Sequence, residues 1–234
     1  MARPFATRRR TCPGLCVTSV QAAVKPPTQA PVQALLFDLG GVIVNTSADT
    51  MVRAWAAYSR LSFDQLKAAF TADQPYQQFE RGEIAAAQFY DHLAQTLQLN
   101  ASHAQIEAGW NAIFLGEISP TVQRIQALRT RFGAKLPLYA FSNTNAVHKK
   151  AWPATCPNVN TLFDQIFTSH ALGLRKPELA AYNQVVQNIG LPAASILFFD
   201  DSHANVDAAL AAGLQAVRVN GPADVEQALQ QVGL

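Results

Sequence analysis

Three short apolar segments, each ending in polar residues, constrain most strongly how this 234-residue chain folds. The first ends at Asp38 and two glycines, the second at Ser142, and the third at Asp200 and Asp201. Because these segments are apolar throughout and do not alternate with polar residues, they predict strands that are buried on both faces. Two shorter strands are expected near the C-terminus. The predicted strands cover residues 35–37, 136–142, 165–168, 195–199 and 214–219.

The segments between the later strands have helical patterns of apolar residues. Strands that alternate with helices are typical of a parallel sheet covered by helices on both faces. In such sheets the ligand binds at the carboxyl ends of the strands, where the polar residues above are placed. The predicted helices cover residues 121–131, 146–152, 177–189, 204–212 and 223–232.

Residues 47–118 break this alternation, because they read as helices without an intervening strand. One of these helices opens with a capping box formed by Ser62 and Gln65. We therefore predict a small helical cap domain at 47–118, inserted after the first strand of a core domain made of 33–46 and 119–234. The predicted cap helices cover residues 51–59, 62–70, 84–97 and 102–110.

The charge distribution separates the first 32 residues from the rest. The chain has a formal net charge of +2, but its first acidic residue is Asp38, and the preceding segment holds five basic residues. That segment is rich in Arg, Ser, Thr and Pro and lacks the apolar core of a secretory signal. It predicts a disordered extension or a transit peptide, and therefore a plastid or mitochondrial location in the second case and a cytoplasmic one otherwise.

Composition excludes several other classes of protein. With 49% apolar residues, the chain can build a sizeable core, which excludes disorder or low complexity as its overall state. No apolar run reaches the roughly 18 residues of a membrane span. The one dense basic run, residues 8–10, lies in the leader, so we expect no nucleic-acid partner and no membrane partner. The default oligomeric state is a monomer or a weak homodimer.

The polar residues at the strand ends have an ordinary structural interpretation when each is taken singly. Asp38 before two glycines is typical of a turn. Ser142 and Asn143, or Asp201 with the serine after it, are typical of helix N-caps. Lys176 before a proline is typical of a solvated residue ahead of a helix.

Taken together, these residues indicate phosphate chemistry. Asp38, Asp200 and Asp201 supply the hard oxygen ligands that Mg²⁺ prefers. Ser142 and the backbone N–H groups that follow it suit phosphate oxygens, and Lys176 adds a positive charge. Because all these groups belong to one end of one sheet, the sequence predicts a site for phosphoryl transfer.

Four motifs resemble those of the haloacid dehalogenase (HAD) superfamily. They are FDLGGV (37–42), FSNTN (141–145), LRKPE (174–178) and FFDDSHAN (198–205). The resemblance covers residues 33–234 and is greatest to the branch of glucose-1-phosphatase-like proteins and epoxide hydrolase phosphatase domains, whose caps resemble YQQFERGEI (76–84). It implies a Rossmann-like three-layer α/β core with a helical cap inserted after the first strand.

The resemblance also implies a two-step phosphatase mechanism. Asp38 would attack phosphorus and form an aspartyl-phosphate that water hydrolyses. Mg²⁺ would be held by the Asp38 carboxylate, the Gly40 carbonyl and Asp201, with Asp200 as a direct or water-mediated partner. The transferred group would be bound by Ser142, the amides of Asn143 and of Gly40 or Gly41, and Lys176. A small phosphorylated metabolite is the expected substrate, with a sugar phosphate favoured.

One position departs from the family pattern. The family places a second Asp two residues after the nucleophile, as general acid and base, and this chain has Gly40 there. Such catalysis is worth about 10²- to 10⁴-fold in rate. A good leaving group such as a sugar 1-phosphate, a held water, or a histidine such as His148 are the possible replacements.

The missing acid leaves two alternatives open. The first is a metal-independent haloacid dehalogenase, in which an Asp attacks carbon; Asp200 and Asp201 argue against it, because halide displacement has no use for clustered carboxylates. The second is a catalytically weak or inactive protein that uses the same fold for binding.

Overall fold

The computed structural model describes Met1 and residues 30–234. The predicted leader, residues 1–32, lies almost wholly outside these described residues. In the described part of the chain, no helix is long and apolar enough to cross a membrane.

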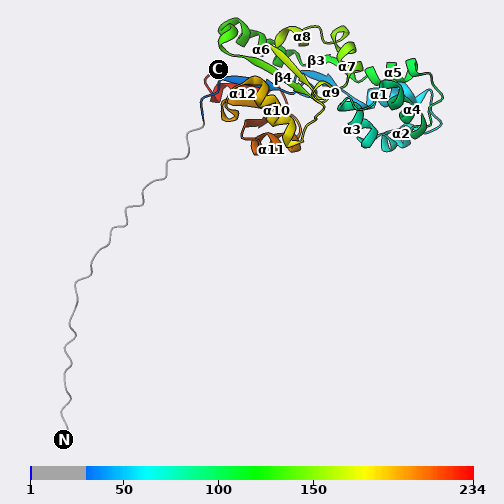
Figure 1. Cartoon of the computed structure of the whole chain (residues 1–234), viewed down its shortest axis with the longest axis horizontal. Helices are drawn as coiled ribbons and strands as arrows, with labels where there is room; N and C mark the ends of the chain where they lie inside the picture. Colours follow the sequence, from blue (N-terminus) through cyan, green and yellow to red (C-terminus); the bar gives the residue numbers. More distant parts are fainter. Residues whose placement is uncertain (2–29) are drawn as a thin grey trace.

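A five-stranded parallel sheet in the order β5-β4-β1-β6-β7 forms the centre of the core (Figure 1). Strand β1 pairs with β4 on one side and with β6 on the other, which confirms the predicted parallel α/β sheet. Every residue of β1 is fully buried, because helices cover both faces of the sheet. The strands are β1 (Ala34–Phe37), β4 (Leu138–Ser142), β5 (Gln165–Thr168), β6 (Ile196–Asp200) and β7 (Gln215–Arg218).

Alternate residues of β1 enter two separate apolar clusters. Leu35 and Phe37 belong to the cluster that α6 and α12 cover, whereas Leu36 belongs to the cluster that α10 and α11 cover. This division follows from the two-residue period of a strand. The core helices are α6 (Ser119–Phe132), α7 (Ala146–Ala151), α8 (Val159–Leu162), α9 (Ser169–Leu172), α10 (Leu179–Ile189), α11 (His203–Ala211) and α12 (Pro222–Gln231).

Five helices between β1 and α6 pack around a third apolar cluster that contains Trp55, Phe89 and Trp110. Gly109 lets α5 approach α1, because a Cβ at this position would lie 2.2 Å from Trp55 Nε1. The predicted capping box of Ser62 and Gln65 is present at the start of α2. The helices are α1 (Ala48–Ala56), α2 (Phe63–Ala69), α3 (Gln74–Glu80), α4 (Ala86–Thr96) and α5 (His103–Asn111).

A two-stranded antiparallel ribbon joins this helical unit to the core. Strand β2 (Val44–Thr46) pairs with β3 (Phe114–Glu117) across about 70 residues of chain. The expectation of helices without a strand at 47–118 is therefore wrong at β3. Three or four residues are too few to show a period, and β3 exists because β2 lies beside it. Helix α3, a seven-residue element with Pro75 in its first turn, was also not predicted.

Candidate active site

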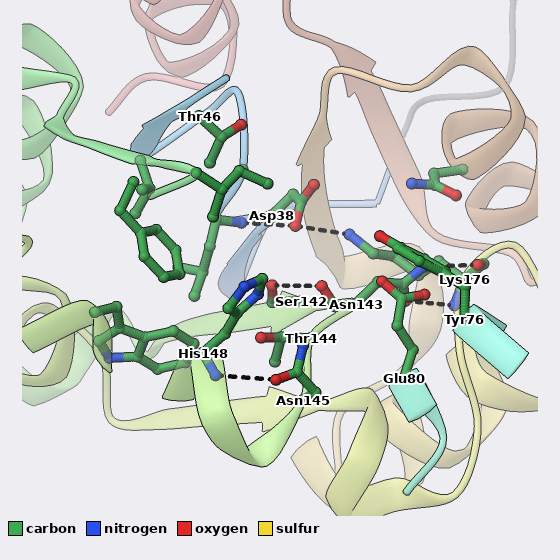
Figure 2. Close-up of a pocket in the computed structure, with 17 residues that line it drawn as sticks. Asp38, Thr46, Tyr76, Glu80, Ser142, Asn143, Thr144, Asn145, His148 and Lys176 are labelled. Atoms are coloured by element: carbon green, nitrogen blue, oxygen red, sulfur yellow. Dashed lines mark hydrogen bonds and ion pairs between the residues drawn. The ribbon is translucent and has the colours of Figure 1, made fainter. Parts of the chain in front are cut away.

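The carboxyl ends of β1, β4 and β6 bring the predicted polar residues together. Asp38 follows β1, Ser142 ends β4 and Asp200 ends β6. They adjoin a cavity of about 180 Å³ between the sheet and the helical unit, to which Asp38, Ser142 and Lys176 contribute lining (Figure 2). This cavity lies at the carboxyl ends of the strands, where parallel sheets bind ligands. It is the candidate active site.

Lys176 lies at the centre of the charged part of this site. Its Nζ is 2.9 Å from Asp38 Oδ1 and 2.6 Å from Asp200 Oδ2, and its side chain is 1% exposed. The side chain of Asn143 fixes the backbone of Lys176, because it donates to the Lys176 carbonyl and accepts from the Lys176 N–H, both at 2.8 Å. The interpretation of Lys176 as a solvated residue is therefore wrong.

Burial and like charge control the ionisation of this cluster. Burial raises the pKa of Asp38 to about 7; Asp200 and Asp201 also raise it, and Lys176 opposes the change. Burial lowers the pKa of Lys176, but Asp38 and Asp200 together raise it above its usual value. The lysine is therefore a fixed positive charge. Any further positive charge nearby would stabilise the ionised carboxylate of Asp38.

The three carboxylates fit a divalent cation. One oxygen from each of Asp38, Asp200 and Asp201 lies within 4.8 Å of the others, and a single lysine leaves the group with excess negative charge. Gly41 makes room for the third carboxylate: its φ is +72°, and a Cβ there would lie 2.3 Å from Asp201 Oδ2. Hard oxygen donors in this arrangement are what Mg²⁺ requires.

Asp200 has a second set of partners that hold it in place. Its Oδ1 accepts from the Ser202 N–H at 2.9 Å and from Asn205 Nδ2 at 3.0 Å. Since Lys176 occupies Oδ2, the Asp200 carboxylate is fully bonded within the protein. Asp200 therefore orients the lysine in this structure, and Asp38 and Asp201 are the carboxylates with fewer partners.

The loop after β4 lines the cavity with Ser142, Asn143, Thr144 and Asn145. Asn145, and not Ser142 or Asn143, caps α7, because its side chain accepts from the His148 N–H at 2.9 Å. The N-cap interpretation of Ser142 and Asn143 is therefore wrong, and the side chain of Ser142 is placed at the cavity beside Asp38 (Figure 2).

His148, one possible replacement for the missing acid, also lines the cavity. Its ring stacks on Trp110, and its Nε2 is 3.1 Å from the Trp110 carbonyl oxygen, to which it donates. Burial lowers the pKa of His148 to about 4, and the bond to the carbonyl opposes this. His148 is therefore neutral near pH 7, with the proton directed away to the backbone, and it is not poised to donate one.

The helical unit contributes cavity residues to which sequence reasoning assigned no role. Tyr76 and Glu80 of α3 form one wall, and Ile113 and Phe114 lie on another with Trp152. No periodicity reveals which side chains of short elements face a neighbouring domain. The only signal was the YQQFERGEI segment (76–84), which contains Tyr76 and Glu80.

Two ion pairs connect α3 to the segment that carries Lys176. Glu80 Oε2 is 2.8 Å from Arg175 Nε, and Arg81 Nη1 is 3.0 Å from Glu178 Oε1. Burial raises the pKa of Glu80, and the Arg175 guanidinium opposes this. These pairs flank Lys176 on the chain, so the docking of the helical unit and the placement of the lysine share one segment.

Comparison with known proteins agrees with this geometry. The family model of haloacid dehalogenase-like hydrolases matches residues 32–213, so the chain belongs to that family and is a hydrolase. A sesquiterpene phosphatase of Aspergillus oryzae is 31% identical over 192 residues, which cover 78% of this chain and 87% of that protein. The resemblance inferred from the four motifs is confirmed.

Two further proteins extend the comparison. A drimenol cyclase of Aspergillus calidoustus is 28% identical over 206 residues, or 86% of this chain, but the match spans only 36% of that longer protein. A HAD family enzyme from Bacteroides thetaiotaomicron, solved in complex with magnesium and inorganic phosphate, has a TM-score of 0.70 at 26% identity and covers 80% of this chain and 93% of its own. The predicted Rossmann-like α/β fold is thereby confirmed.

The lowered pKa of His148 predicts a pH dependence of stability. Its folded pKa of about 4 lies below the ordinary 6.5, so between these values the unfolded chain binds more protons than the folded one. Stability from neutral His148 is fully present above pH 6.5 and is lost as pH falls to 4. His148→Phe should reduce this loss by up to about 3 kcal/mol in urea unfolding across that range. His203→Gln, at an exposed position, is the control. An equal change in the pH dependence of stability in both variants would contradict the prediction.

The Glu80–Arg175 pair predicts a contrast between two neighbouring glutamates. Glu80→Gln leaves the guanidinium without its anionic partner where both side chains are largely buried, so we expect a loss of about 3 kcal/mol in the free energy of unfolding. Glu83, whose side chain is 43% exposed and pairs with Arg81, is the matched control, and Glu83→Gln should cost less than about 1 kcal/mol. Equal losses in urea unfolding would show that the buried pair does not stabilise docking.

Proposed function

We propose that this HAD-like hydrolase is a Mg²⁺-dependent phosphatase that acts on a small phosphorylated metabolite through an aspartyl-phosphate on Asp38. The observation that carries the proposal is the buried Lys176 Nζ held between Asp38 and Asp200, with Asp201 and Ser142 beside them. A carboxylate nucleophile needs positive charge beside it, from Lys176 and a divalent cation, to approach a phosphate dianion.

Asp38 and Asp201, together with the Gly40 carbonyl, would hold the Mg²⁺. Asp200 would contribute indirectly, by orienting Lys176 or by contacting the cation through a water. When bound, the cation supplies positive charge to the carboxylates and the phosphate oxygens. Among described residues the strand-end cluster already has the oxygen donors for this role. The related HAD structure with magnesium and phosphate supports the assignment.

The chain's own residues perform the remaining steps. Ser142, Lys176 and the amides of Asn143 and of Gly40 or Gly41 bind the phosphoryl oxygens and align phosphorus with Asp38. One Asp38 oxygen attacks phosphorus, the bond to the ester oxygen breaks, and the alkoxide leaves with the electron pair and takes a proton from water. Water then attacks the aspartyl-phosphate, releases inorganic phosphate and restores the Asp38 carboxylate.

Within this class of substrates, the sequence favours a sugar phosphate. The sesquiterpene phosphatase relative supports hydrolysis of a phosphate ester, although the alcohol in its name is not a sugar. The dehalogenase alternative is not favoured, because Asp200 and Asp201 crowd negative charge beside the nucleophile and a metal-independent displacement of halide gains nothing from it. A binding protein without turnover is the second alternative, and the following experiment separates all three.

Asp38→Asn should abolish phosphate release from an aryl phosphate in the presence of Mg²⁺, because an amide is not a nucleophile toward phosphorus. Phosphate release by the unaltered protein should also stop on chelation and return with Mg²⁺. Asp64→Asn, at an exposed position on α2, is the control and should keep full activity. Metal-independent halide release from a haloacid would identify a dehalogenase, and ligand binding with neither activity would identify a binding protein; either result overturns the proposal.

Gly40→Asp should restore general acid catalysis, because a Cβ at Gly40 would have its nearest neighbour, Thr46 Oγ1, at 3.9 Å. The expected gain in kcat is about 10²-fold for alkyl phosphates, whose alcohols leave poorly, and much smaller for aryl phosphates. Gly41→Ala is the matched control: its Cβ would displace the Asp201 carboxylate, so it should lose activity on both esters. Equal gains on both esters in Gly40→Asp would contradict the leaving-group argument.

A further inference from the structure

The cavity has an apolar wall opposite its charged end. Ile113, Phe114 and Trp152 line it together with Val44 and Leu39, whereas Tyr76 lies beside Glu80 and Lys176 (Figure 2). Because Asp38, Ser142 and Lys176 occupy the other end, the alcohol part of a bound ester lies against this wall. Flat apolar groups pack well on such aromatic surfaces.

Several polar side chains near this wall already bond within the protein. The Tyr76 hydroxyl is hydrogen-bonded to Glu80, and Glu80 is paired with Arg175. His148 Nε2 donates to the Trp110 carbonyl, and Asn145 Oδ1 accepts from the His148 N–H. Thr46 and Thr144 also line the cavity, and their hydroxyls keep hydrogen-bonding capacity. A sugar would have to desolvate several hydroxyl groups and would meet few free partners beyond these, which is costly.

The acid of the family pattern is missing from this site. Gly40 has no side chain where the family places its acid, and the pKa of His148 is lowered to about 4 with its proton on the backbone bond. Glu80, which also lines the cavity, is held by Arg175 Nε at 2.8 Å, and this pairing opposes the rise that burial causes in the pKa of Glu80. An alcohol with an ordinary high pKa leaves slowly from such a site, since protonation of the leaving oxygen is worth about 10²- to 10⁴-fold.

From the apolar wall and the absent acid together, we infer that the substrate is a phosphate ester of a flat, unsaturated alcohol, a phenol or an enol, whose oxygen departs without protonation. This inference rests on the proposed phosphatase activity and replaces the sugar preference within it. Asp38 displaces the oxyanion from phosphorus, the oxyanion takes a proton from water, and hydrolysis of the aspartyl-phosphate consumes one water. The sum is one ester and one water converted to one free phenol or enol and one inorganic phosphate.

Five phosphate compounds assayed with Mg²⁺, four esters and one acyl phosphate that is counted with them below, separate shape from leaving ability. Naphthyl phosphate is flat with a good leaving group, benzyl phosphate is flat with a poor one, and glycerol phosphate is neither. Acetyl phosphate is small with a good leaving group, and a hexose 1-phosphate tests the sugar. We expect kcat/KM to be highest for naphthyl phosphate, and about tenfold higher for benzyl than for glycerol phosphate, because the ring packs on the wall.

Variants of the wall test where the ring binds. Phe114→Ala should lower kcat/KM for naphthyl phosphate about tenfold and leave acetyl phosphate unchanged. Phe114→Leu, which keeps bulk and therefore the fold, should show a smaller loss of the same kind. Leu115→Ala is the matched control, because Leu115 is the next residue of β3 and is 48% exposed; it should change neither ester.

The outcomes distinguish a wrong substrate class from a wrong phosphatase proposal. If the hexose 1-phosphate equals or exceeds naphthyl phosphate, or if Phe114→Ala and Phe114→Leu lower both esters equally, the substrate class is wrong and the phosphatase stands. If the unaltered protein with Mg²⁺ releases phosphate from none of the five esters, the phosphatase proposal itself fails.

Discussion

The buried ammonium group of Lys176 between Asp38 and Asp200 is the interaction on which the site depends. Two carboxylates this close repel, and burial makes their charged forms costly, so an unpaired arrangement would leave them protonated. The lysine is 1% exposed and reaches both at hydrogen-bond distance. It thereby allows carboxylates to gather at the strand ends, and Asn143, in the loop after β4, holds the backbone of Lys176.

The same segment also receives the helical unit. Arg175, one residue before Lys176, pairs with Glu80 of α3, and Glu178, two residues after Lys176, pairs with Arg81 directly after α3. Gly82 brings the chain so close to the core that a Cβ there would lie 2.7 Å from the His170 carbonyl oxygen. The docking of the helical unit and the placement of Lys176 therefore depend on the same segment of the chain.

The two consecutive glycines after Asp38 serve different purposes. Gly41 has a left-handed backbone and leaves the space that the Asp201 carboxylate fills, so any side chain there removes a candidate metal ligand. Gly40 has open space instead, and its missing side chain is a chemical difference from the family pattern without a steric cause. Combined with a neutral, backbone-bonded His148, it makes the identity of the alcohol decisive for turnover.

The sequence by itself determined the parallel sheet, the helices around it and the gathering of Asp38, Ser142 and Asp200 at one edge, because uniformly apolar strands must be buried on both faces and their carboxyl ends coincide. Only the tertiary structure decided that β2 and β3 pair, that Asn145 and not Ser142 caps α7, and that Glu80 and Phe114 reach the cavity. The strand pairing and the reach of Glu80 and Phe114 join segments far apart in the chain, and local periodicity carries no information about which distant surfaces come into contact. The cap is local, but Ser142, Asn143 and Asn145 are all residue types that cap helices, so the sequence did not single out Asn145.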